Sequence, residues 1–117
     1  MTVISLPSRI DFDAVFKSPD ARVSNRDFLV LAKHLEHAVS HRIGFVTSKK
    51  KIRRAVDRNR FRRIIREYLR QQNADRCADI VVIARQIPDR LWSTHYQTQL
   101  DQVFAKLFKS LQKHHRE

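Results

Sequence analysis

The sequence is short of cysteine, glycine and acidic residues. Its 117 residues include one cysteine, one glycine and three prolines, and only 12 Asp or Glu stand against 24 Lys or Arg. The single cysteine, Cys77, excludes an internal disulfide and a cysteine-cluster zinc site, and it suits a reducing cytoplasm. The few acids are scattered along the chain, which argues against a two-metal nuclease centre or acid–base catalysis by the protein itself. We therefore predict neither a catalytic residue nor a metal ligand.

Long hydrophobic runs are also missing. No apolar stretch approaches the roughly 18 residues that a membrane-spanning helix needs, so no membrane partner is expected. Met1–Pro7 lacks a charged leader and a long apolar core, so we expect no signal peptide. The length suits a single domain over residues 1–117, with flexible ends at 1–7 and 113–117.

The apolar residues that are present recur in groups whose spacing predicts helices and strands. Ser8, followed three residues later by Asp11, is typical of a helix N-cap, and Ser18-Pro19-Asp20 is typical of a helix end. A second helix is predicted from about Ala55 to Gln72, and a third around the one-face repeat from Leu100 to Leu111. Strands are predicted at 28–32, 43–47 and 80–84, with a short edge strand at 22–23.

The polar segment from Lys33 to Arg42 predicts a long hairpin loop between the first two main strands. Its histidines, His34, His37 and His41, have a spacing that could hold a metal on a helix, but no cysteine or carboxylate cluster accompanies them, so we expect them to be solvated. Together the elements predict an α/β (α+β) sandwich. One small mixed sheet of about four strands packs with about three helices in the order α-β-β-β-α-β-α, with a parallel crossover through the second helix.

The segment from Lys49 to Arg70 carries most of the excess positive charge. It holds eleven Lys or Arg and only two acids, so it contributes +9 of the net charge of +12. At about 100° per residue, one arc of the predicted helix collects apolar side chains and the other side collects arginines. The apolar arc contains Phe61, Ile64, Ile65, Tyr68 and Leu69. Arginines so close together repel one another unless an anion neutralises them, so this segment predicts a nucleic-acid-binding surface.

Two long stretches, Arg42–Lys50 and Arg54–Arg66, closely resemble the signature of the bacterial ribonuclease P protein component. That signature is a basic residue with Ile-Gly in a strand, a Lys-Lys pair, Ala-Val, and then Arg-Asn-Arg followed by further arginines. Asp11–Phe16 is similar to the family's N-terminal motif, Asn25–Phe28 to the lead-in of its next strand, and Asp79–Arg85 to its last strand. The similarity covers almost the whole chain.

The resemblance implies a subunit of a ribonucleoprotein that removes 5′ leaders from precursor tRNAs. It implies that the catalyst is the RNA subunit with Mg²⁺, and that the partners are this RNA and the leader of precursor tRNA, with no obligatory protein partner. By position, it implies catalytic-RNA contacts at Lys49, Lys50, Arg53, Arg54, Arg58, Asn59, Arg60 and Arg63. It also implies a leader cleft in which Phe12, Phe16, Leu31, Arg62 and Arg66 converge, a suitable lining for a single strand.

The sequence departs from the family pattern at three places. Leu31 replaces an aromatic residue of the leader cleft, Ser18-Pro19-Asp20 replaces a glycine after the first helix, and Arg53 replaces a glycine before Ala-Val. Two alternatives to the subunit assignment stay open. One is a general RNA-binding or ribosomal-type protein, and the other is a DNA-binding domain whose arginine helix enters the major groove.

Overall fold

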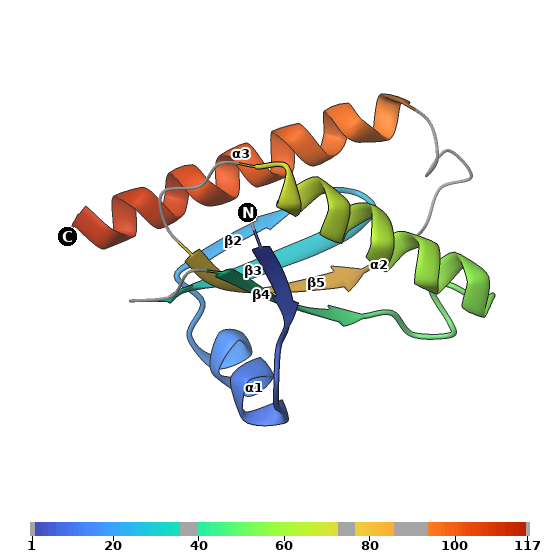
Figure 1. The fold of residues 1–117 in the computed structure, drawn as a ribbon, viewed down its shortest axis with the longest axis horizontal. Coiled ribbons are helices and arrows are strands. Elements are labelled where there is room, and N and C mark those ends of the chain that lie inside the picture. The colour runs from blue at the N-terminus through green and yellow to red at the C-terminus, as the bar shows by residue number, and fades with distance from the viewer. Residues whose placement is uncertain (1, 36–39, 73–76, 86–93, 117) are drawn as a thin grey trace.

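The computed structural model describes residues 2–35, 40–72, 77–85 and 94–116, in which five strands form one sheet and three helices flank it (Figure 1). In chain order the elements are β1 (Thr2–Ser5), α1 (Arg9–Lys17), β2 (Ala21–Ser24), β3 (Phe28–Leu35), β4 (Ser40–Val46), α2 (Ala55–Arg70), β5 (Cys77–Ala84) and α3 (Thr94–Arg116). The predicted α/β sandwich is confirmed, as are its three helices and the short edge strand β2.

The strand order β1-β4-β5-β3-β2 makes the sheet mixed. Strands β4 and β5 are parallel neighbours joined through α2, so the predicted crossover is confirmed. The predicted hairpin between β3 and β4 is wrong. Strand β5 lies between them, antiparallel to β3 and parallel to β4. The apolar run from Ile80 to Ala84 is suited to burial on both faces, and this favours a central strand with a neighbour on each side.

The N-terminal residues take part in the sheet. Strand β1 runs parallel to β4, with Thr2 opposite Ser40 and Ser5 opposite Ile43. The expectation of flexible residues 1–7 did not include this strand, which adds a fifth to the four predicted. At the other end of the chain, α3 continues to Arg116. None of the described helices is long and apolar enough to span a membrane.

Each face of the sheet has its own core because strand side chains alternate between the faces. On one face, α2 and α3 pack on a large cluster that includes Val30, Ile80 and Val82. On the opposite face, α1 covers a smaller cluster that includes Leu31 and Val81. Figure 1 shows α1 standing alone on its side of the sheet. The sheet therefore separates α1 from α2.

His41, within the predicted loop Lys33–Arg42, belongs to strand β4 and is not solvated. The imidazole is fully buried in β4, its Nδ1 accepts a hydrogen bond of 3.1 Å from the Ala78 N–H, and its ring stacks on Phe108 at 5.4 Å between centroids. Burial lowers the pKa of His41. The prediction of a solvated His41 is therefore wrong. His34 belongs to β3, and His37 lies outside the described residues.

Candidate nucleic-acid interface

Helix α2 buries one face and exposes arginines on the other. The predicted apolar arc is confirmed, since Phe61, Ile65, Tyr68 and Leu69 are buried and Ile64 packs against the same core. A 16-residue helix with this pattern needs little beyond burial of its apolar face to be fixed on the sheet. Its polar side is left to carry charge.

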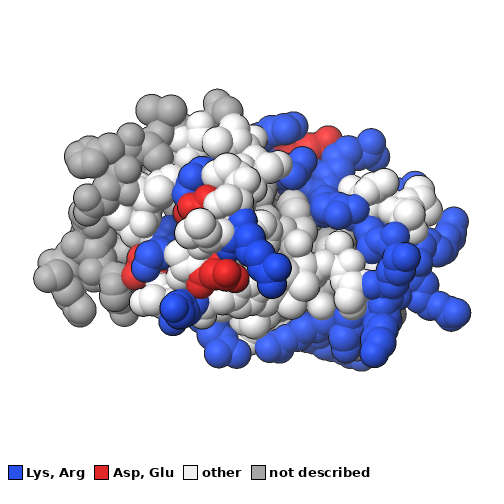
Figure 2. Space-filling view, turned by 90° about the horizontal axis from the view of Figure 1, so that it is seen from below, with Lys and Arg blue, Asp and Glu red and all other residues white. Residues whose placement is uncertain are grey.

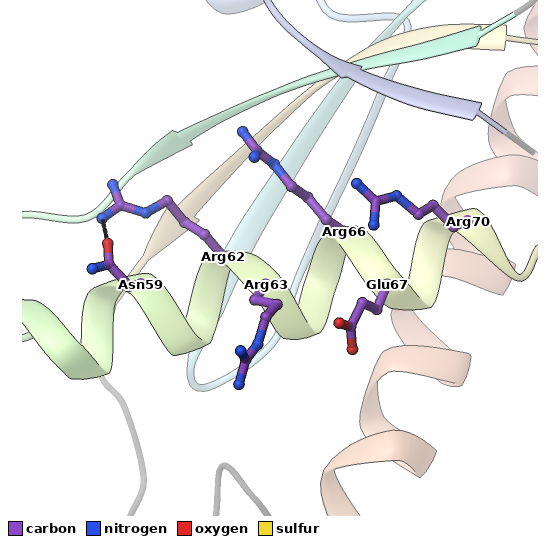
Figure 3. Close-up of a pocket in the computed structure, with 6 residues that line it drawn as sticks. All are labelled: Asn59, Arg62, Arg63, Arg66, Glu67 and Arg70. Carbon is purple, nitrogen blue, oxygen red and sulfur yellow. Dashed lines mark hydrogen bonds between the residues drawn. The ribbon is translucent and has the colours of Figure 1, made fainter.

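The polar side of α2 forms an open hollow of about 590 Å³ (Figure 3). It is lined by Asn59, Arg62, Arg63, Arg66, Glu67 and Arg70. Arg62, Arg66 and Arg70 follow one another at every fourth residue, a rise of about 6 Å per step, and Figure 3 shows them pointing to the same side of the helix. Arg70 was not among the predicted contacts, although this four-residue spacing is visible in the sequence. Four arginines against one glutamate make the hollow suited to phosphate groups.

Two arginines of this hollow are held by neighbouring groups. The Nη2 of Arg62 donates to the Oδ1 of Asn59 at 2.7 Å. The Nη2 of Arg66 donates to the Oγ of Ser5 in β1 at 2.8 Å, and its Cζ lies 5.7 Å from the centre of the Phe45 ring. These contacts restrict long side chains before any ligand arrives, which lowers the entropic cost of binding. Strand β1, absent from the predicted fold, is thus part of the frame around the site.

The loop between β4 and α2 is shaped by Arg58. Its Nη1 donates to the carbonyl oxygens of Ile52 and Arg53, at 2.9 and 3.1 Å. The Ile52 side chain is buried, and the Ser48 carbonyl accepts from the N–H groups of Lys51 and Ile52, which closes a turn. Arg58, predicted as a contact to the catalytic RNA, thus has one nitrogen committed to holding the loop.

The other predicted contacts to the catalytic RNA are displayed on the surface. The exposed residues are Lys49, Lys50, Arg53, Arg54, Asn59, Arg60 and Arg63. The Nε of Arg54 lies 3.8 Å from the Oδ2 of Asp57, but three quarters of the Arg54 side chain is exposed. This ion pair therefore contributes little to the stability of the fold. Figure 2 shows Lys and Arg crowded at one end of the molecule, and most of the acidic residues visible in this view lie away from it. The charge is therefore concentrated where the sequence predicts it.

The predicted leader residues do not all converge. Phe12 packs its ring on Gly44, and Phe16, on the same helix, is 45% exposed. Leu31 is buried in the small core under α1, so its side chain is not available to a ligand in this arrangement. Arg62 and Arg66 belong to α2 on the opposite face of the sheet. The predicted single cleft is therefore divided into an aromatic part on α1 and a cationic part on α2.

Known proteins resemble this chain over most of its length. The family model described as Ribonuclease P matches residues 3–110. The ribonuclease P protein component of Chromohalobacter salexigens is 40% identical over 105 residues, which cover 88% of this chain and 80% of that protein. That of Pseudomonas aeruginosa is 41% identical over 102 residues, covering 86% and 71%. The solved structure of the Staphylococcus aureus RNase P protein superposes with a TM-score of 0.74 at 32% identity, covering 89% of this chain and 96% of that one.

Proposed function

This chain belongs to the ribonuclease P protein component family, and we propose that it binds the catalytic RNA through α2 and the preceding loop, and the 5′ leader of precursor tRNA through α1. Membership makes it the protein subunit of an enzyme of tRNA processing. The cleavage itself is assigned in this proposal to the RNA subunit.

The observation that carries the proposal is the basic surface formed by the β4–α2 loop and α2. Eleven Lys or Arg occur within 22 residues, and all of them lie in the β4–α2 loop or in α2. Such a surface gains free energy by releasing counterions from an RNA backbone. The arginine row at 62, 66 and 70 offers one guanidinium about every 6 Å, suited to successive phosphates of a strand.

The leader is assigned to α1 because α1 presents an aromatic ring to solvent. An exposed phenylalanine offers a stacking face to any base, which suits a leader of variable sequence. Phe16 is the stronger candidate, since Phe12 is largely engaged with Gly44. Arg62 and Arg66 are proposed to hold the RNA backbone from the α2 side. These two arginines reach the RNA leader only where the leader passes the edge of the sheet formed by β1. Arg66 is directed toward this edge.

Magnesium ions are assigned to the RNA subunit. Near α1, Asp11 and Asp79 are bridged by the guanidinium of Arg42, whose charge opposes a cation there. We also propose a cytoplasmic location, where a ribonucleoprotein of this kind would meet precursor tRNA.

Reconstitution tests the proposal directly. The pure protein is mixed with bacterial ribonuclease P RNA and a precursor tRNA at low magnesium, and cleavage at the mature 5′ end is measured. We expect the mixture to cut where neither component alone is appreciably active. Tight RNA binding without any effect on cleavage would refute the subunit role and favour a general RNA-binding protein.

Two variants and one control variant then separate the proposed surfaces. Arg63→Ala, on α2, should weaken assembly with the catalytic RNA, whereas Lys106→Ala, an exposed residue of α3, should not. Phe16→Ala should reduce the affinity of the assembled enzyme for leader-bearing precursor more than for mature tRNA. Equal losses of affinity for the two tRNAs would refute the assignment of the leader to α1.

A further inference from the structure

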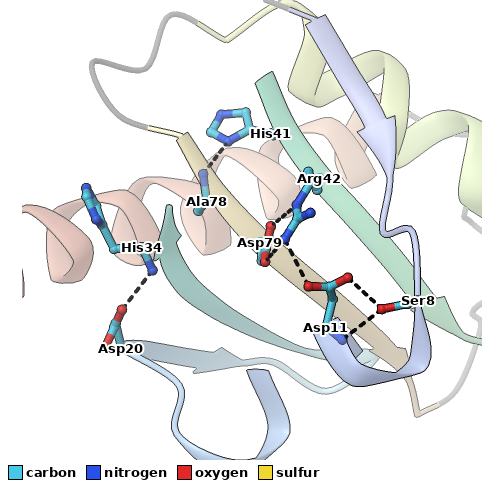
Figure 4. Close-up of polar contacts among 8 residues, drawn as sticks. All are labelled: Ser8, Asp11, Asp20, His34, His41, Arg42, Ala78 and Asp79. Carbon is cyan, nitrogen blue, oxygen red and sulfur yellow. Dashed lines mark hydrogen bonds and ion pairs between the residues drawn. The ribbon is translucent and has the colours of Figure 1, made fainter. Parts of the chain in front are cut away.

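Basic side chains of the sheet hold α1 at both of its ends. Near the N-terminus, Arg42 of β4 donates from Nε and Nη2 to the two carboxylate oxygens of Asp79, both at 2.6 Å, and from Nη2 to the Oδ1 of Asp11 at 3.2 Å (Figure 4). At the C-terminus, the Nζ of Lys33 donates to the Ser18 carbonyl at 3.1 Å. Both residues are cationic, but these contacts are internal to the protein and not directed at RNA.

We call the link from Asp11 through Arg42 to Asp79 the Arg42 tie. Arg42 and Asp79 are direct neighbours on the parallel strands β4 and β5, and Asp79 keeps only 10% of its side chain exposed. The hydrogen bonds to Asp79 raise the pKa of Arg42 further, so the guanidinium stays charged. The second oxygen of Asp11 accepts from the Ser8 hydroxyl at 2.7 Å. One guanidinium therefore links the first turn of α1 to the centre of the sheet.

The position of Asp11 on α1 explains what this link controls. At 100° per residue, Asp11, Val15, Phe12 and Phe16 lie in this order across about 140° of the helix surface. Val15 is fully buried in the middle of the arc, and Phe12 rests on Gly44. Asp11 marks one flank of the arc and Phe16 marks the other. If α1 rolled about its axis, movement at Asp11 would change how far Phe16 stands out from the sheet.

We propose that Arg42 is a positioning residue for leader binding: by holding Asp11 it fixes the roll of α1 and so the presentation of Phe16 to a leader base. The inference rests on the proposed function, because it assumes that α1 meets the leader. Arg42 acts through Phe16 and makes no contact with RNA. Helix α1 has only nine residues and packs on a small apolar core, so apolar contacts alone restrict its rotation weakly. The bonds from Arg42 supply a further restraint.

Matched acidic variants on α1 test the inference. Asp11→Ala and Asp13→Ala each remove one negative charge from the same helix, but Asp13 is exposed and is not bonded to Arg42. Simple electrostatics predicts that both variants bind every RNA slightly more tightly. The positioning role predicts that Asp11→Ala alone loses preference for the leader. Arg42→Met serves as a second variant on the other side of the tie.

The measurement is the dissociation constant of the assembled enzyme for a precursor tRNA and for the mature tRNA, with thermal unfolding recorded for each variant. We expect the ratio of the two constants to fall by about fivefold or more in Asp11→Ala and Arg42→Met, comparable to the loss of one stacked base. Asp13→Ala should keep the wild-type ratio. The double variant Asp11→Ala/Phe16→Ala should show no further fall below Phe16→Ala alone.

The outcomes distinguish the positioning role of Arg42 from the proposed binding of the leader by α1. If the wild-type enzyme shows no preference for precursor, leader binding by α1 fails and the inference fails with it. If the wild type prefers precursor and folded Asp11→Ala keeps the full ratio, only the positioning role is refuted. An equal fall in Asp13→Ala, or additive losses in the double variant, would also refute it.

Discussion

Replacing the single glycine, Gly44, by alanine should destabilise the protein through one neighbour, the ring of Phe12. An ideally placed Cβ on Gly44 would lie within 2.8 Å of three carbon atoms of that ring. Carbon atoms in contact are normally separated by about 3.5–4.0 Å. The ring must therefore retreat by roughly 1 Å, and α1 must move with it or Phe12 must leave its rotamer.

The size of the effect follows from two opposing contributions. Overpacking costs about 1–3 kcal/mol. Against this, alanine restricts the unfolded chain more than glycine does, which stabilises the fold by about 0.4–1 kcal/mol where the backbone conformation suits it. We expect Gly44→Ala to lower the free energy of unfolding by about 1–2 kcal/mol. In a Phe12→Ala background the clash is absent, so the same change should stabilise by about 0.5 kcal/mol.

A double-mutant cycle measures this coupling. Urea unfolding of the wild type, both single variants and the double variant, followed by far-UV circular dichroism, gives four free energies of unfolding. The predicted coupling of about 2 kcal/mol is well above the additivity error of about 0.3–0.5 kcal/mol. Equal costs of Gly44→Ala with and without the Phe12 ring would refute the close approach as the reason for glycine at this position.

Three further predictions concern buried groups and charge. Burial lowers the pKa of His41 in the folded protein. Below about pH 6.5, the ordinary pKa of histidine, the unfolded chain therefore binds a proton more readily than the folded protein does. The free energy of unfolding should fall as the pH drops below that value. His41→Asn, which keeps an acceptor for Ala78, should flatten this dependence in urea unfolding between pH 8 and 5. Tyr68→Phe removes the 2.6 Å hydrogen bond from the Tyr68 hydroxyl to Asp101 and should lower the free energy of unfolding by about 1 kcal/mol. An unchanged free energy of unfolding would show that this bond does not stabilise the fold. If about six phosphates are neutralised, the affinity for the catalytic RNA should fall on the order of a thousandfold between 50 and 200 mM salt, and a flat salt response would contradict the electrostatic account.

Local patterns in the sequence predicted the helices well. The apolar arc of α2 and the one-face repeat of α3 bury the side chains that their spacing indicates, because a helix face depends on residues three or four positions apart. The Ser8 cap of α1 is also local, and its Oγ accepts from the Asp11 N–H as predicted. Strand pairing is not local. The position of β5 between β3 and β4 joins residues that are far apart in the chain, which no short window of sequence reveals.

The same distinction applies to the candidate site. The density of basic residues identified the α2 surface, but it did not show which of them the fold uses internally. Arg42 and Asp79 are 37 positions apart, and their pairing depends on the β4–β5 register. Arg58, by contrast, contacts carbonyls five and six residues before it. A count of charges does not show which arginines hold other parts of the protein, and only the tertiary structure reveals these internal contacts.

Strand β4 connects the two proposed binding surfaces because its side chains alternate between the faces of the sheet. Ile43 and Phe45 pack toward α2. On the other face, Arg42 bonds to Asp11 of α1, and Gly44 contacts the ring of Phe12. A strand that is paired on both sides is stiff, so the offset between α1 and α2 is set by β4 and not by a flexible linker. When α2 is fixed on the catalytic RNA, α1 must then stand at a defined place beside it. A change at the Arg42 tie should therefore alter how the leader is held while leaving assembly of the subunits intact.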